Sequence, residues 1–96
     1  MIKHIVFFKF KPEAAEADII DLGQSLKALP ELISEVLSFS CGRDVIRSER
    51  SYDMALVANF ADLEALNRYQ VHPEHQVVIA KVKRLADSVV AVDYEC

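Results

Sequence analysis

The sequence predicts an α+β protein in which a βαββαβ chain forms a four-stranded antiparallel sheet. Four stretches alternate apolar and polar side chains with a period of two, and helical stretches follow the first and the third of them. Two right-handed β-α-β crossovers in this order place the helices on one face of the sheet. The 96 residues hold no linker, repeat or low-complexity segment, so we expect one domain over residues 1–96.

The first strand is expected from Ile2 to Phe10, because this stretch alternates and is rich in β-branched and aromatic residues. Its even positions form the face toward the core, and Val6 and Phe8 among them are expected to line a pocket there. His4 is the only polar residue on that face. A histidine at such a position is a candidate functional residue.

The first helix is expected after Pro12, which suits the first turn of a helix. Apolar residues then recur every three or four positions, at Ile19, Leu22, Leu26, Leu29 and Ile33. Pro30 is expected to end the regular helix near Leu29, because the residue before a proline disfavours the α conformation.

Two further strands are expected from Glu35 to Asp44 and from Tyr52 to Phe60, joined by a charged loop. The even positions of the later strand, among them Met54 and Leu56, are apolar and should face the core. The first and third strands are the most apolar, so we expect them at the centre of the sheet.

The second helical region should begin at Asp62, a good N-cap, and carry Tyr69 on its inward stripe. The dipeptide His72-Pro73 should break this region, since proline favours the first position of a new helix. His75 heads the apolar stripe of that new helix. A last strand is expected from Ser88 to Tyr94.

The outer face of the sheet is also partly apolar, yet no helix remains to cover it. Ile5 and Phe7 lie on this face between lysines, and Ala55 and Val57 lie on it in the third strand. An apolar share of 52 % is high for so short a chain. We therefore expect an isologous homodimer through the open sheet face.

His4, Tyr69 and His75 should converge on one pocket between the helices and the sheet. Histidine can exchange a proton near neutral pH, and a tyrosine hydroxyl can donate a hydrogen bond to a carbonyl or an enolate. This combination suits proton abstraction beside a carbonyl group. The alternative is that each histidine is a hydrogen-bonded core residue, and that His72 only caps a helix. A metal site is not expected, because no carboxylate or cysteine completes a ligand set.

The sequence resembles the stress-responsive A/B barrel (Dabb) family of dimeric α+β barrels over nearly its whole length. The run Tyr69-Gln70-Val71-His72-Pro73-Glu74-His75 is the most specific match. Supporting matches are Lys3-His4-Ile5-Val6, Tyr52-Asp53-Met54-Ala55-Leu56-Val57 and Val92-Asp93-Tyr94-Glu95. The resemblance implies a ferredoxin-like subunit that pairs sheet to sheet into a barrel.

Plant polyketide cyclases of this family are similar to the chain at His4, Tyr69 and His75. The resemblance implies that these three residues are catalytic and that His72 shapes the turn and supports the pocket. It also implies a pocket lined from the first helix and the third strand, by Leu22, Leu26, Met54 and Leu56.

Two functions follow as hypotheses. The first is a stress-response protein that binds a small apolar carbonyl compound and has cyclase-like, aldol-type acid–base activity without a cofactor. The second is a non-catalytic stress-response or ligand-carrier protein.

The formal charge of −4 and the scattered basic residues argue against nucleic-acid binding. The lack of a long apolar run and the two cysteines, which we interpret as free thiols, favour a cytoplasmic protein without membrane contact.

Overall fold

The computed structural model describes all 96 residues and confirms the predicted βαββαβ order. The four strands form one antiparallel sheet in the order β2-β3-β1-β4, so the first and third strands are central as expected. The elements are β1 (Ile2–Phe10), α1 (Glu16–Leu32), β2 (Ser38–Arg43), β3 (Met54–Phe60), α2 (Leu63–Val71), α3 (Pro73–Leu85) and β4 (Ala86–Glu95).

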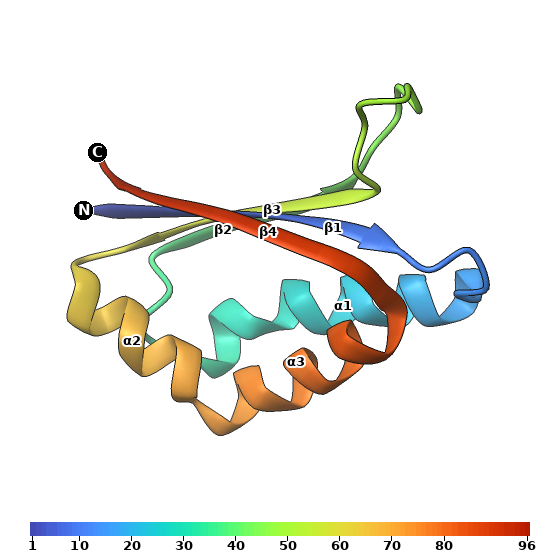
Figure 1. The fold of residues 1–96 in the computed structure, drawn as a ribbon. Coiled ribbons are helices and arrows are strands. Elements are labelled where there is room, and N and C mark those ends of the chain that lie inside the picture. Colours follow the sequence, from blue (N-terminus) through green and yellow to red (C-terminus); the bar gives the residue numbers. More distant parts are fainter.

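All three helices lie on one face of the sheet, and the opposite face carries no helix (Figure 1). The register of the central strands explains which side chains reach the helices. His4 stands opposite Ala58 in β3 and opposite Asp93 in β4, so these three residues share the inner face. None of the helices is both long enough and apolar enough to cross a membrane.

Helix α1 corrects one expectation, because it continues past Pro30 to Leu32. Pro30 has no N–H to donate to a carbonyl of the preceding turn, but the chain after it stays helical, and the last turn is closed when the Ile33 N–H donates to the Leu29 carbonyl at 2.9 Å. Leu29 and Ile33 are both fully buried. Packing therefore holds the last turn in place against the preference of the residue before proline.

The corner between α2 and α3 is fixed by two side-chain caps. Asp62 accepts a hydrogen bond from the Ala65 N–H at 2.8 Å and begins α2, as expected. His72 has an extended backbone, and its Nδ1 accepts from the Glu74 N–H at 3.1 Å to begin α3. Pro73 occupies the first turn of α3, where its missing N–H leaves no acceptor unpaired.

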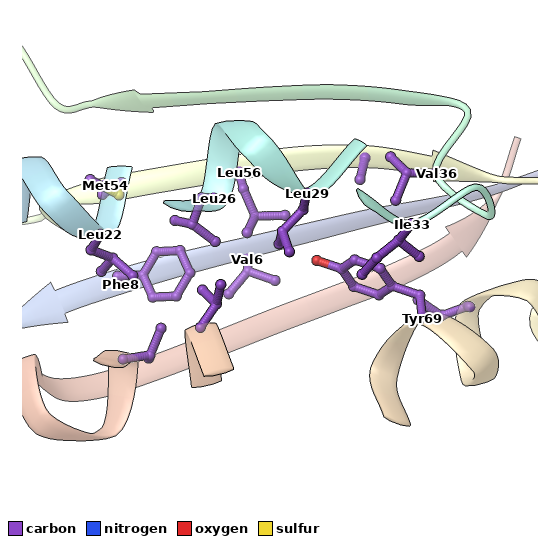
Figure 2. Close-up of a cluster of buried hydrophobic side chains, with 14 of the residues drawn as sticks. Val6, Phe8, Leu22, Leu26, Leu29, Ile33, Val36, Met54, Leu56 and Tyr69 are labelled. Carbon is purple, nitrogen blue, oxygen red and sulfur yellow. The ribbon is translucent and has the colours of Figure 1, made fainter. Parts of the chain in front are cut away.

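The core lies between the helices and the inner face of the sheet (Figure 2). Phe8, Leu22 and Met54 pack together at one end of the cluster that the figure shows. Ile33 and Tyr69 lie at the other end. The polar residues that interrupt this apolar interior are therefore informative about function, and His4 is the one buried polar residue.

Candidate functional site

A cavity of about 180 Å³ lies between the sheet and the helices and contains the three predicted site residues. Its wall is mostly apolar and comes from β1, β3, β4 and all three helices. The residues that line it are His4, Val6, Phe8, Leu26, Leu56, Tyr69, Gln70, His75, Val78, Ile79, Val82, Val89 and Ala91. A few polar groups in an apolar hollow are typical of small-molecule sites.

His4 is 5 % exposed and forms a hydrogen-bonded ion pair with the carboxylate of Asp93 through its Nδ1 atom. A carboxylate accepts hydrogen bonds, so Nδ1 carries the proton, and Nε2 is left as an acceptor when the ring is neutral. The geometry therefore equips His4 to accept and return a proton.

Asp93 is a site residue for which the sequence alone predicted no role. The signal that could have found it is the alternation of β4, in which Val89, Ala91 and Asp93 occupy the same face. A carboxylate on the inward face of a strand requires a partner, because an unpaired buried charge is costly. The identity of that partner depends on the pairing of β4 with β1.

His75 is half-buried at the first turn of α3, and its Nδ1 lies 3.1 Å from the carbonyl oxygen of Gln70. Since a carbonyl can only accept, Nδ1 carries the proton and Nε2 has the free lone pair. Burial lowers the pKa of His75 below its ordinary value of 6.5, and the charges of His4 and His72 lower it further. The hydrogen bond to Gln70 opposes this shift. His75 is consequently a neutral base at pH 7.

Tyr69 is 1 % exposed and lies near both histidines of the cavity. Its ring centroid is 4.3 Å from that of His75 and 6.2 Å from that of His4. Burial raises the pKa of Tyr69 to about 12, and no hydrogen bond contributes to this shift. The hydroxyl group points inward toward Leu29 (Figure 2). It therefore remains protonated at neutral pH and is free to donate a hydrogen bond.

The structure separates the other expected pocket residues into two groups. Val6, Phe8, Leu26 and Leu56 line the cavity. Leu22, Met54 and His72 lie outside its lining, contrary to the expectation from the resemblance. Leu22 and Met54 are buried in the core at the far end of α1 and β3, and the His72 ring is turned to the N-terminus of α3.

The side chains around the cavity do not form a metal centre. No group of three or more histidine, cysteine or carboxylate residues is arranged to hold a metal ion. The chemistry that the residues can perform is proton transfer by His4 and His75, and hydrogen-bond donation by Tyr69.

These features define the class of the protein as a ferredoxin-like fold with a histidine-containing cavity under its sheet. The family model of the stress-responsive A/B barrel domain matches residues 2–96. The chain therefore belongs to the stress-responsive A/B barrel domain family, as the resemblance indicated.

Two relatives and one solved structure show what this chain is similar to. An uncharacterised protein of Streptomyces coelicolor is 31 % identical over 97 residues, which cover 99 % of both chains. Olivetolic acid cyclase of Cannabis sativa is 28 % identical over 76 residues, which cover 77 % of this chain and 75 % of the cyclase. A dimeric ferredoxin-like protein of unknown function from Thermobifida fusca superposes with a TM-score of 0.90 at 26 % identity, covering 99 % of this chain and 90 % of that one.

Proposed function

We propose that this protein binds a small, largely apolar carbonyl compound in the cavity and catalyses proton transfer on it without a cofactor. The observation that carries the proposal is the convergence of His4, Tyr69 and His75 on one apolar cavity. The similarity to olivetolic acid cyclase supports a ring-closing, aldol-type reaction as the specific activity.

In the proposed reaction His75 Nε2 removes a proton from the carbon beside the carbonyl group. The Tyr69 hydroxyl donates a hydrogen bond to the oxygen of the enolate that forms. The enolate carbon then attacks a second carbonyl carbon of the same molecule, which forms the new carbon–carbon bond. His4 in its protonated form, held by the hydrogen bond to Asp93, donates its Nε2 proton to the resulting alkoxide, so one proton is taken up and one is returned.

The volume of the cavity limits the size of the reacting group. A cavity of about 150 Å³ in another protein holds one benzene molecule, and the cavity here is about 180 Å³. The proposed substrate therefore places about one ring, or the chain that becomes that ring, inside the protein. Any longer substituent would have to extend through the opening of the cavity.

We also propose that the working form is a homodimer that covers the open sheet face. Four large apolar residues are exposed on this face, namely Phe7, Val90, Val92 and Tyr94. Phe7 and Val90 stand opposite each other in the pairing of β1 with the edge strand β4. The related Thermobifida fusca protein is described as dimeric. Sedimentation velocity at micromolar concentration should give about twice the chain mass of 10.8 kDa, and Val92→Lys should shift the distribution toward monomer.

The catalytic proposal can be tested by exchange of the α-protons of cyclohexanone and acetophenone in heavy water, followed by proton NMR. The wild-type protein should accelerate exchange above the buffer rate. His75→Ala should lower the protein-dependent rate by about 10² to 10⁴-fold, because the general base is lost. Tyr69→Phe keeps the ring but should lower that rate by about 10² to 10³-fold, because the donor to the enolate is lost.

His72→Asn provides the matched control, because it removes a histidine outside the cavity and retains an acceptor for the Glu74 N–H. It should leave the exchange rate unchanged. A wild-type rate no faster than buffer with both ketones would overturn the acid–base proposal. Equal rates for wild type and His75→Ala would overturn the assignment of the base.

A non-catalytic ligand carrier is the second candidate function. The observation that favours it is that both histidines already have protein partners, His4 with Asp93 and His75 with Gln70, as structural core histidines do. A carrier should shift the ring resonances of Tyr69 and His75 when a one-ring ketone is added, without accelerating proton exchange.

A further inference from the structure

The loop between β2 and β3 is the most exposed apolar feature of the molecule. It rises from the sheet on the side away from the helices (Figure 1). Val45 is 87 % exposed and Ile46 is 75 % exposed, and we refer to this adjacent pair of β-branched side chains as the tip. Single exposed apolar residues are common on protein surfaces, but such a pair on a projecting loop indicates a contact surface.

The loop is held in a defined shape by hydrogen bonds on both sides of the tip. The Arg47 N–H donates to the Asp44 carboxylate at 2.6 Å, and the Arg47 guanidinium donates to the Asp53 carboxylate at 2.7 Å. Arg47 has a φ of 59°, a left-handed conformation that is uncommon for a residue with a side chain. Ser48 and Ser51 close the following turn through their hydroxyl groups, which are 2.9 Å apart. The tip is therefore pre-organised for binding.

The base of the loop is tied to the sheet as firmly as the tip. The Asp53 N–H donates to the Phe8 carbonyl at 2.8 Å, and the Asp53 carboxylate accepts from the Phe10 N–H at 2.7 Å. The Asp44 N–H donates to the Asp53 carbonyl at 3.0 Å and closes the hairpin. These contacts fix the direction in which Val45 and Ile46 project.

A hollow of about 400 Å³ lies beside the base of this loop and reaches the open sheet face. Phe7 and Tyr52 form its aromatic wall, with their ring centroids 6.1 Å apart. Ala55 adds further apolar surface, and the buried Met54 lies behind it. The rest of the lining is Gly42 and the charged residues Arg43, Asp44 and Arg50. The aromatic part of the hollow is therefore the part that is complementary in chemistry to the branched aliphatic side chains of Val45 and Ile46.

We infer that the Val45–Ile46 tip of each copy docks into the Phe7–Tyr52 hollow of a second copy of this chain. The two features lie on the same side of the sheet, so they can form an isologous contact in which tip meets hollow and hollow meets tip. Two sheets that pack face to face are about 10 Å apart, and a loop that projects from that face lies in the path of the partner. This inference rests on the proposed homodimer and adds its anchoring residues.

The first test measures the dimer dissociation constant by sedimentation equilibrium. Val45→Asp and Ile46→Asp should each raise it by at least about tenfold, because apolar burial is lost and a carboxylate would have to be desolvated. Val77→Asp is the matched control, because Val77 is 59 % exposed on α3, on the helix-covered side of the sheet. It should leave the constant unchanged. A dimer that both tip variants leave as tight as wild type would overturn the inference while the homodimer itself stood.

The second test distinguishes contact between tip and hollow from contact between two tips. Chains with Ile46→Cys are mixed with chains with Tyr52→Cys, both in a Cys96→Ser background, and are oxidised with oxidised glutathione. The disulfide that the inference predicts joins one chain of each kind, and two molecules of reduced glutathione are released as it forms. The inference predicts this mixed product and little product from Ile46→Cys chains alone. Cross-linking of Ile46→Cys chains with one another would show that the tips meet each other, and a wild-type monomer would remove the inference together with the homodimer.

Discussion

The phenol ring of Tyr69 lies 4.3 Å from the imidazole of His75, measured between ring centroids, with 42° between the ring planes. Burial favours the uncharged form of both side chains. It raises the pKa of Tyr69 to about 12 and lowers the pKa of His75. The pair therefore combines a neutral base with a protonated donor over the range around neutral pH.

The lowered pKa of His75 predicts a specific dependence of stability on pH. In the unfolded chain His75 should titrate near 6.5, and in the folded protein it should titrate below that value. As the pH falls from 6.5 toward the lower folded pKa, the unfolded chain binds a proton before the folded protein does, and the free energy of unfolding decreases. Above pH 6.5 this group contributes no slope.

Proton NMR of the histidine rings measures the pKa of His75 in the folded protein directly. Urea unfolding at several pH values measures the effect of this pKa on stability. His75→Gln should lack the part of the stability loss that occurs below pH 6.5. A ring titration of His75 above 6.5 would contradict the assignment of burial as the dominant cause.

Removing the partner of His4 should destabilise the protein. Asp93→Ala leaves the Nδ1–H of a buried imidazole without an acceptor, which we expect to cost about 1–3 kcal/mol in urea unfolding at pH 7. The Asp93 side chain is partly exposed, so the loss should lie toward the lower end of this range. Asp93→Asn retains an acceptor oxygen and should recover part of the lost free energy of unfolding. Equal stability of wild type and Asp93→Ala would indicate that water replaces the carboxylate.

The cap at His72 predicts a local effect on α3. His72→Ala should lower the free energy of unfolding by about 1 kcal/mol, because the Glu74 N–H loses its acceptor. His72→Asn should stay within a few tenths of a kcal/mol of wild type, since asparagine is a favourable N-cap. Hydrogen exchange should show faster opening of the first turn of α3 in the alanine variant alone.

Gly23 offers a stabilising substitution within α1. A Cβ atom at this position would lie 3.8 Å from Met54 Cε, an ordinary van der Waals contact. Gly23→Ala should therefore raise the free energy of unfolding by about 0.5–1 kcal/mol, because alanine has the higher helix propensity. Urea unfolding of the two proteins side by side measures this, and a destabilised variant would show that α1 packs more tightly on β3 than this distance indicates.

Local features of the sequence were sufficient to predict the architecture. The alternation of Ile2–Phe10 and the helical spacing after Pro12 depend only on residues within a few positions of one another. The break at His72-Pro73 is equally local, since proline and an adjacent acceptor begin a helix wherever they occur. The inward positions of Tyr69 and His75 follow from the same periodicity.

Other features were decided by packing over long distances in the sequence. Pro30 remains within α1 because Leu29 and Ile33 are buried on either side of it, and that burial outweighs the local preference. Leu22 and Met54 face the core but not the cavity, because the position of a hollow along an apolar face depends on every side chain that packs there.

The pairing of His4 with Asp93 shows most clearly which features follow from the local sequence and which depend on the tertiary structure. The sequence by itself determined that His4 lies on the inner face of the first strand, because a strand alternates with a period of two. Only the tertiary structure supplied its partner, which is 89 positions away in the chain. That contact depends on the register between β1 and β4, and a shift of one residue would place Asp93 on the opposite face of the sheet.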